Sequence, residues 1–93
     1  MDMAQAKDFQ KEAQILKALA HPTRLLIVET LLVGQKCVSD IQELLHASQP
    51  NVSQHLNILK VSGIVDFQQK GNLRCYHLNH PEKIKTILAT IAS

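Results

Sequence analysis

The stretch of residues 48–60 limits the possible folds of this chain more than any other segment. Val52, Leu56 and Leu59 recur at the i, i+4, i+7 spacing of a helix that packs one face on a core, and Ser48 suits its N-cap. Most other positions in its first two turns carry amides, hydroxyls or an imidazole: Gln49, Asn51, Ser53, Gln54 and His55. A solvated helix normally carries Lys and Glu instead. Because Asn, Gln and Ser can bond base edges, this helix is predicted to read a DNA major groove, with Ser48 among the predicted contacts.

The neighbouring segments place this helix in a larger motif. Ser39 with Gln42 three residues later predicts a capping box at the start of a preceding helix, which ends just before Ala47. Two strand-like segments, 64–68 and 73–78, then flank a turn that contains Gly71. A helix-turn-helix followed by a β-hairpin is a winged helix. Three polar residues of the wing are predicted to contact the DNA backbone: Lys70, Asn72 and Arg74.

The whole chain is predicted to form one winged helix-turn-helix domain over residues 1–93, mainly α-helical with a small β-hairpin wing. Apolar spacing and capping residues give the approximate bounds of five helices and the wing. The predicted helices are about 6–20, 22–33, 39–46, 49–62 and 81–92, and the predicted wing is about 64–78.

Four sequence segments together resemble the ArsR/SmtB family of dimeric bacterial transcriptional repressors. They read ILKALAHPTRLLIVETLL, CVSDIQELL, SQPNVSQHLNILKVSGIV and GNLRCYHL. The resemblance covers roughly residues 9 to 92. It implies a winged-helix repressor that binds an inverted-repeat operator in double-stranded DNA. It also implies that the first and last helices pair across a two-fold axis.

Apolar stripes on these two terminal helices fit such a dimer. A chain this short buries a thin core, and association adds burial. The predicted interface consists of Phe9, Leu16, Ile84, Ile87, Leu88 and Ile91. In a symmetric homodimer, the two recognition helices would lie about 34 Å apart, one turn of DNA.

The distribution of charge also favours DNA binding, although the net charge is only +2. Residues 1–46 carry five Lys/Arg against six Asp/Glu, whereas residues 47–93 carry five against two. The basic excess therefore lies in the half that contains the recognition helix and the wing. Phosphate contacts there would supply affinity, and the uncharged helix face would supply sequence preference.

The two cysteines are the candidate sensing residues. Cys37 lies where arsenic-sensing members of the family begin a Cys-Val-Cys-Asp sequence, but Ser39 replaces the second thiol here. The resemblance also implies a zinc site on the last helix, yet residues 81–93 contain no His and only one acid. Neither of these family sites is therefore expected.

A different site is predicted if the segment before residue 39 pairs with the second wing strand. Tyr76 and Leu78 would then face inward, whereas Cys37, Cys75 and His77 would converge on the outward side. These three side chains could bind zinc or a similar soft metal ion. The two thiols could instead form an oxidation-sensitive pair, or the cysteines could be bystanders. In a cytosolic protein, free thiols are expected in preference to a structural disulfide.

The sequence thus predicts a DNA-binding regulator, most simply a repressor that a thiol-reactive species or a soft metal ion releases from its operator. The alternatives are a winged-helix regulator with an organic effector or none, and a winged-helix protein-interaction module. An enzyme is not expected, because no phosphate-binding loop or paired catalytic residues are evident. The chain has no 18-residue apolar run and no signal-peptide pattern at its start, so a cytoplasmic location without membrane contact is expected.

Overall fold

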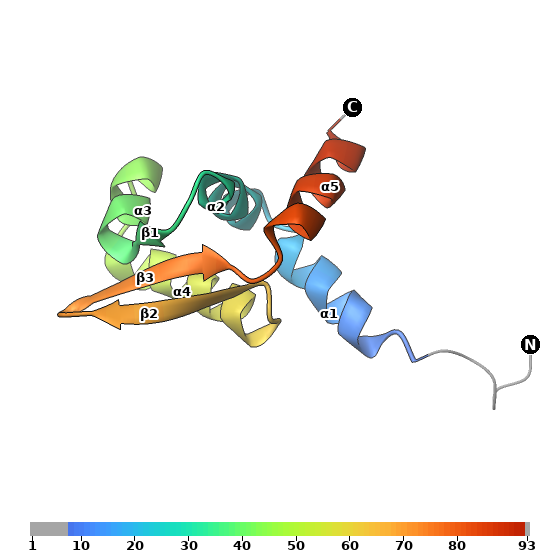
Figure 1. Ribbon diagram of the computed structural model, residues 1–93, viewed down its shortest axis with the longest axis horizontal. Coiled ribbons are helices and arrows are strands. Elements are labelled where there is room, and N and C mark those ends of the chain that lie inside the picture. Colours follow the sequence, from blue (N-terminus) through green and yellow to red (C-terminus); the bar gives the residue numbers. More distant parts are fainter. Residues whose placement is uncertain (1–7, 93) are drawn as a thin grey trace, which may run out of the picture.

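The computed structural model describes residues 8–92 and confirms a winged helix-turn-helix (Figure 1). Along the chain, its elements are α1 (Gln10–Leu19), α2 (Pro22–Leu32), β1 (Lys36–Cys37), α3 (Val38–Leu45), α4 (Gln49–Val61), β2 (Val65–Lys70), β3 (Leu73–Leu78) and α5 (Pro81–Ile91). The predicted bounds agree to within a few residues. The largest difference is at α1, which was predicted from residue 6 and begins at Gln10; residues 6 and 7 lie outside the described range.

The three strands form an antiparallel sheet in the order β1-β3-β2. β2 and β3 form the predicted hairpin, with Val65 opposite Leu78 and Lys70 opposite Leu73. Gly71 has a φ of +62° in the connecting turn, a conformation that glycine adopts without strain. β1 pairs with the other side of β3, as expected for the segment before α3. The wing is therefore attached directly to the chain that enters the helix-turn-helix.

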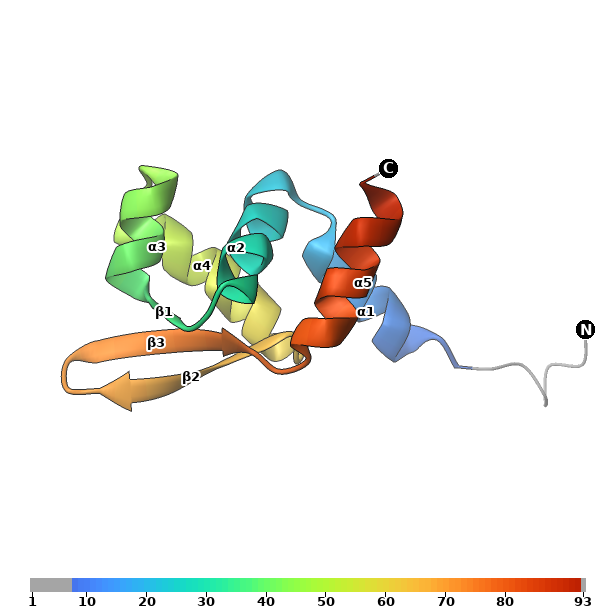
Figure 2. The same ribbon diagram turned by 45° about the horizontal axis from the view of Figure 1, so that its top comes forward.

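The molecule is elongated, with the wing and the terminal helices at opposite ends (Figure 1). Figures 1 and 2 show the tip of the hairpin at one end, and α1 and α5 at the other. α2 lies between these ends and contacts α1, α4, α5 and β3. The long axis, 52 Å against 30 and 21 Å for the other two, separates the wing from the terminal helices.

The core forms where α2, α3 and α4 meet the base of the sheet. The most deeply buried large side chains come from all of these elements: Ile27, Val28, Ile41, Val52, Leu56, Leu59 and Val65. Three of them make up the predicted apolar stripe of α4, which fixes the rotation of this helix about its axis. Its polar residues must therefore point away from the core.

Local hydrogen bonds set the start of each helix of the helix-turn-helix. Ser48 Oγ accepts a hydrogen bond from the Asn51 amide at 3.3 Å, so the predicted N-cap of α4 is confirmed. The predicted capping box of α3 is wrong. The N-cap is Cys37, whose amide donates to Asp40 Oδ2 at 3.2 Å. A carboxylate three residues after Cys37 satisfies that amide, so the helix begins before Ser39.

Candidate nucleic-acid interface

A groove of about 800 Å³ separates the recognition helix α4 from the wing. α4 contributes one stripe of uncharged and basic side chains: Gln49, Ser53, Asn57 and Lys60. The hairpin contributes the opposite wall: Phe67, Gln69, Asn72, Leu73, Arg74 and Tyr76. Val38, Ser39 and Gln42 of α3 close one side. None of the residues that line this groove is acidic, so it offers hydrogen-bonding groups and two cations to a polyanion.

Four residues that were predicted to bind DNA line this groove. Gln49 and Ser53 come from α4, and Asn72 and Arg74 come from the wing. The Gln49 side-chain amide donates to Ser53 Oγ at 3.2 Å, which orients both groups on the same side of the helix. The structure therefore joins the two halves of the predicted interface, although they lie some twenty residues apart in the sequence.

Four other predicted contacts, from α4 and its N-cap, lie outside the groove: Ser48, Asn51, Gln54 and His55. Asn51 and Gln54 are exposed on other sides of the helix, where they remain free to meet DNA. Ser48 is exposed, but its hydroxyl already accepts the capping hydrogen bond.

His55 occupies a different environment from its polar neighbours. Its ring packs against His21 at the start of α2, with the ring centroids 4.7 Å apart. Its Nδ1 atom is buried and has no hydrogen-bond partner among the described residues. Burial lowers the pKa of His55, and the neighbouring His21 and Arg24 lower it further. His55 therefore packs between α2 and α4, and the DNA contact predicted for it stays a prediction.

Lys70 is exposed near the tip of the hairpin, and its ammonium group is hydrogen-bonded to another side chain. Its Nζ donates to Gln35 Oε1 at 3.1 Å, and the Gln35 amide donates to the Cys75 carbonyl at 3.3 Å. Gln35 immediately precedes β1. This pair of hydrogen bonds links the far end of β2 to the segment that leads into α3.

Nine residues that line the groove were not predicted to bind DNA, among them Asn57, Lys60, Phe67 and Gln69. Asn57 and Lys60 continue the spacing of Gln49 and Ser53 along one side of α4, so the sequence did contain a signal for them. Phe67 had no such signal, because its role depends on contacts with two other elements.

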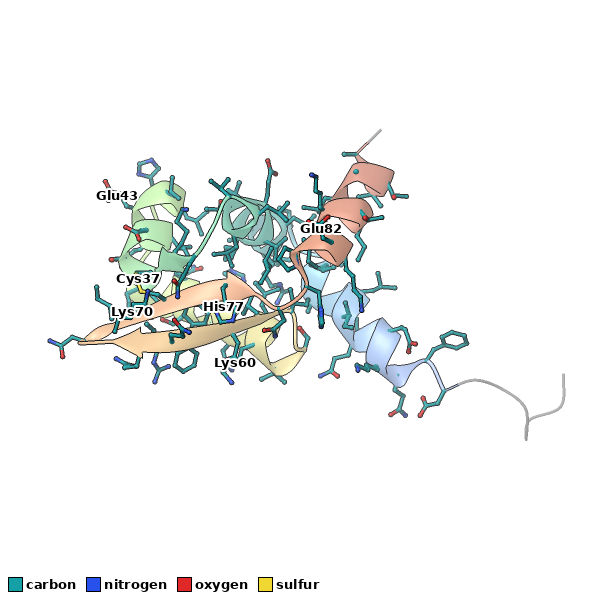
Figure 3. The ribbon with its side chains drawn as sticks, viewed as in Figure 1. Cys37, Glu43, Lys60, Lys70, His77 and Glu82 are labelled. Atoms are coloured by element: carbon teal, nitrogen blue, oxygen red, sulfur yellow. A yellow bond between two sulfur atoms is a disulfide. The ribbon has the colours of Figure 1, made fainter. Side chains whose placement is uncertain are left out.

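The two cysteines converge, as predicted, and form a disulfide between β1 and β3 (Figure 3). The expectation of free thiols is thus not met. The predicted exposure of Cys75 is also wrong, since only 2% of this residue is accessible. Its sulfur is bonded to Cys37 of β1, and its carbonyl accepts a hydrogen bond from the Gln35 side chain.

His77 does not complete a metal site with these cysteines. It pairs with Asp66 of β2 across the sheet. Across residues 8–92, no group of three or more His, Cys, Asp or Glu side chains is arranged to hold a metal ion. The arrangement thus offers a sulfur pair, without the imidazole that the metal interpretation needs.

The predicted dimer residues fall into three groups. Phe9, Leu16 and Ile91 are 59%, 60% and 64% exposed, so they are available to a partner. Ile87 and Leu88 are partly buried against the core. Ile84 is only 5% exposed, so its assignment to the interface is wrong. It faces inward in the first turns of α5 and belongs to the core of the monomer.

Comparisons with known proteins agree with this architecture. Residues 21–66 match the family described as bacterial regulatory protein, arsR family. The HTH-type transcriptional repressor SmtB of Mycobacterium tuberculosis is 39% identical over 79 residues, which cover 85% of this chain and 58% of that protein. An uncharacterized HTH-type transcriptional regulator of Methanocaldococcus jannaschii is 38% identical over 84 residues, which cover 89% of this chain and 93% of that protein.

The fold is also similar to that of a solved structure. HlyU from Vibrio cholerae superposes with a TM-score of 0.79 at 27% identity, and the match covers 100% of both chains. Among the described residues, no helix is long and apolar enough to cross a membrane. The sequence matches, the superposition and the groove between helix and wing lead to one assignment: this chain belongs to the arsR family of bacterial regulatory proteins.

Proposed function

We propose that this protein is a homodimeric, sequence-specific repressor of transcription that acts on DNA in the cytoplasm. The observation that carries the proposal is the groove in which Gln49 and Ser53 of α4 face Asn72 and Arg74 of the wing. α4 enters the major groove by its N-terminal half, and the wing follows the adjacent backbone. The SmtB relative is named as a repressor, which supports the direction of control.

Specificity and affinity come from different parts of this surface. The exposed amides of Asn51 and Gln54, with Gln49, can bond base edges. Lys60 and Arg74 can pair with phosphates of any sequence, which makes affinity dependent on salt. The operator is an inverted repeat, because two copies related by a two-fold axis present two such helices.

We infer that the dimer forms through the end of the molecule that carries α1 and α5. Phe9, Leu16 and Ile91 leave large apolar side chains exposed there. This end is remote from the wing tip (Figure 1), so pairing leaves both wings free for DNA. A neighbouring structure, from Mycobacterium bovis, is described as a homodimeric winged helix-turn-helix domain.

The releasing signal is proposed to be oxidation of Cys37 and Cys75. Hydrogen peroxide can convert the thiol pair to the disulfide: one thiol reduces the peroxide to give a sulfenic acid and one water, and the second thiol attacks the sulfenic acid and releases a second water as the S–S bond forms. The bond joins β3 of the wing to Cys37, the N-cap of α3. It therefore fixes the wing against the helix-turn-helix and limits its adjustment to the DNA backbone.

Fluorescence anisotropy with DNA from the region upstream of the gene tests both sequence-specific binding and release by oxidation. We expect the reduced protein to bind the inverted repeat more tightly than a scrambled duplex of equal length. We expect peroxide to weaken this binding, and Cys37→Ser or Cys75→Ser to remove that effect. Equal affinity for both duplexes in the reduced state would refute sequence-specific binding.

The same assay separates oxidation from metal binding. Zinc is added to the reduced protein, and His77→Gln is compared with wild type. Release by zinc that requires His77 as well as the cysteines would replace the thiol proposal with a soft-metal site. Release by neither peroxide nor zinc would make the cysteines bystanders.

A further inference from the structure

The ring of Phe67, in β2, contacts both cations of the groove. The guanidinium carbon of Arg74 lies 4.7 Å from the centroid of its ring, and Lys60 Nζ lies 5.6 Å from it. Arg74 comes from β3 and Lys60 from α4, so a single ring contacts the positive charges of both walls of the groove. Figure 3 shows Lys60 beside the hairpin.

The ring is itself held in place by its neighbours. Phe67 pairs with Tyr76 across the hairpin, and their ring centroids lie 5.3 Å apart at a tilt of 45°. Tyr76 is only 5% exposed, and Phe67 packs on the edge of the core. The aromatic face is therefore held against the core at the wall of a groove with both polar and apolar residues.

An aromatic face differs from a carboxylate as a partner for these cations. The quadrupole of the ring attracts a cation without cancelling its charge. A carboxylate in the same position would neutralise it and would repel a phosphate. Asp66 Oδ1 lies 4.0 Å from Lys60 Nζ, at the limit for an ion pair, and the side chains are 54% and 41% exposed, so water weakens this pair and leaves Lys60 available to a phosphate. Phe67 can thus orient Arg74 and Lys60 while leaving both charged toward a third group.

We propose that Phe67 is a positioning residue for DNA binding, which holds Arg74 and Lys60 in the directions that meet backbone phosphates on the two sides of the groove. This inference rests on the proposed function. It assigns to an apolar residue a share of the affinity for DNA that the two cations supply. Because phosphates carry no sequence information, this contribution is the same for operator and random DNA.

The test compares Phe67→Leu with Phe67→Tyr in the full chain. Leucine keeps an apolar side chain against the core but has no aromatic face, whereas tyrosine keeps the face. We expect Phe67→Leu to weaken binding to operator and to random DNA by about threefold to tenfold, and Phe67→Tyr to bind within about twofold of wild type. Thermal unfolding followed by circular dichroism confirms that each variant is folded at the assay temperature.

A double-mutant cycle separates positioning from general damage. Phe67→Leu is repeated in a variant that carries Lys60→Gln and Arg74→Gln, which has no cation for the ring to hold. We expect no further loss there. A loss as large as that in wild type, or unchanged affinity of Phe67→Leu in the wild-type background, overturns the proposal.

A spectroscopic measurement provides a readout without DNA. We expect the ring current of residue 67 to shift the Arg74 side-chain protons upfield in wild type and in Phe67→Tyr, and the shift to disappear in Phe67→Leu. Absence of the shift in wild type overturns the proposed geometry. If the ring-current shift is present but wild type binds no DNA, the proposed function has failed and the contact has another use.

Discussion

At the scale of single residues, the helix phase of α4 separates side chains that look alike in the sequence. Gln54 and His55 are neighbours, and both were predicted to contact DNA. The apolar stripe of Val52 and Leu56 fixes the rotation of the helix and leaves Gln54 exposed, whereas His55 packs on His21. Apolar spacing alone identifies the buried face well. It does not reveal that α2 approaches a flank of the helix, because that contact joins residues far apart in the chain.

Gln54→Ala tests base reading by an exposed amide. We expect discrimination between operator and random DNA to fall by about 1–3 kcal/mol, because a bidentate pair with a base is lost, while random-sequence affinity stays unchanged. Competition binding with the two duplexes measures this. Gln68→Ala is the matched control, since Gln68 alternates with the groove residues Phe67 and Gln69 and so points away from the groove. An equal loss in both variants would contradict base reading by Gln54.

The lowered pKa of His55 gives a prediction for the dependence of stability on pH. The folded state resists protonation of this partly buried ring, whereas the unfolded chain takes up a proton near the ordinary value of 6.5. Stability from this site is therefore complete above pH 6.5 and decreases as the pH falls from 6.5 toward the folded pKa. Urea unfolding between pH 7.5 and 5.5 measures the decrease. We expect His55→Gln, which does not titrate, to flatten it; an identical slope in this variant would assign the effect to another group.

At the scale of elements, hairpin and helix signals are strong because they depend on neighbouring residues. Ser48 before α4 and Gly71 in the wing turn act as predicted. The start of α3 was misplaced because two overlapping capping patterns compete, one from Ser39 and one from Cys37 with Asp40. Pairing of Cys37 with β3 favours the second, since it holds the backbone before α3 in an extended conformation. The sequence alone does not weigh such long-range pairing.

Two serine variants check these helix starts directly. We expect Ser48→Ala to destabilise the protein by about 1 kcal/mol, because the Asn51 amide loses its acceptor. That change corresponds to a decrease of roughly 4–8 °C in the melting temperature of a domain of this size. Ser39→Ala is expected to change it little, since alanine is a good helix former at a position inside α3. A larger effect at Ser39 than at Ser48 would contradict the observed start of α3.

At the scale of the whole molecule, the core and the proposed interface use the same kinds of residue. From the Ile/Leu stripe on α5 alone, side chains that face the core of the monomer cannot be distinguished from side chains that face a partner. The rotation of α5 against α2 decides this, and it buries Ile84 while leaving Ile91 64% exposed. The same limit applies to Cys75, whose buried side chain is bonded to Cys37, 38 residues earlier in the chain.

This division leads to opposite expectations for two substitutions in the terminal helices. Leu16→Glu places a charge on an exposed apolar position of α1, so we expect a folded monomer that binds operator DNA weakly because only one half-site is engaged. Ile84→Ala opens a cavity in the core, so we expect a loss of about 2–5 kcal/mol in unfolding free energy with the dimer contacts intact. Sedimentation and urea unfolding measured on both variants separate the two effects. A dimeric Leu16→Glu protein would place the interface elsewhere, and a stable but monomeric Ile84→Ala protein would return Ile84 to it.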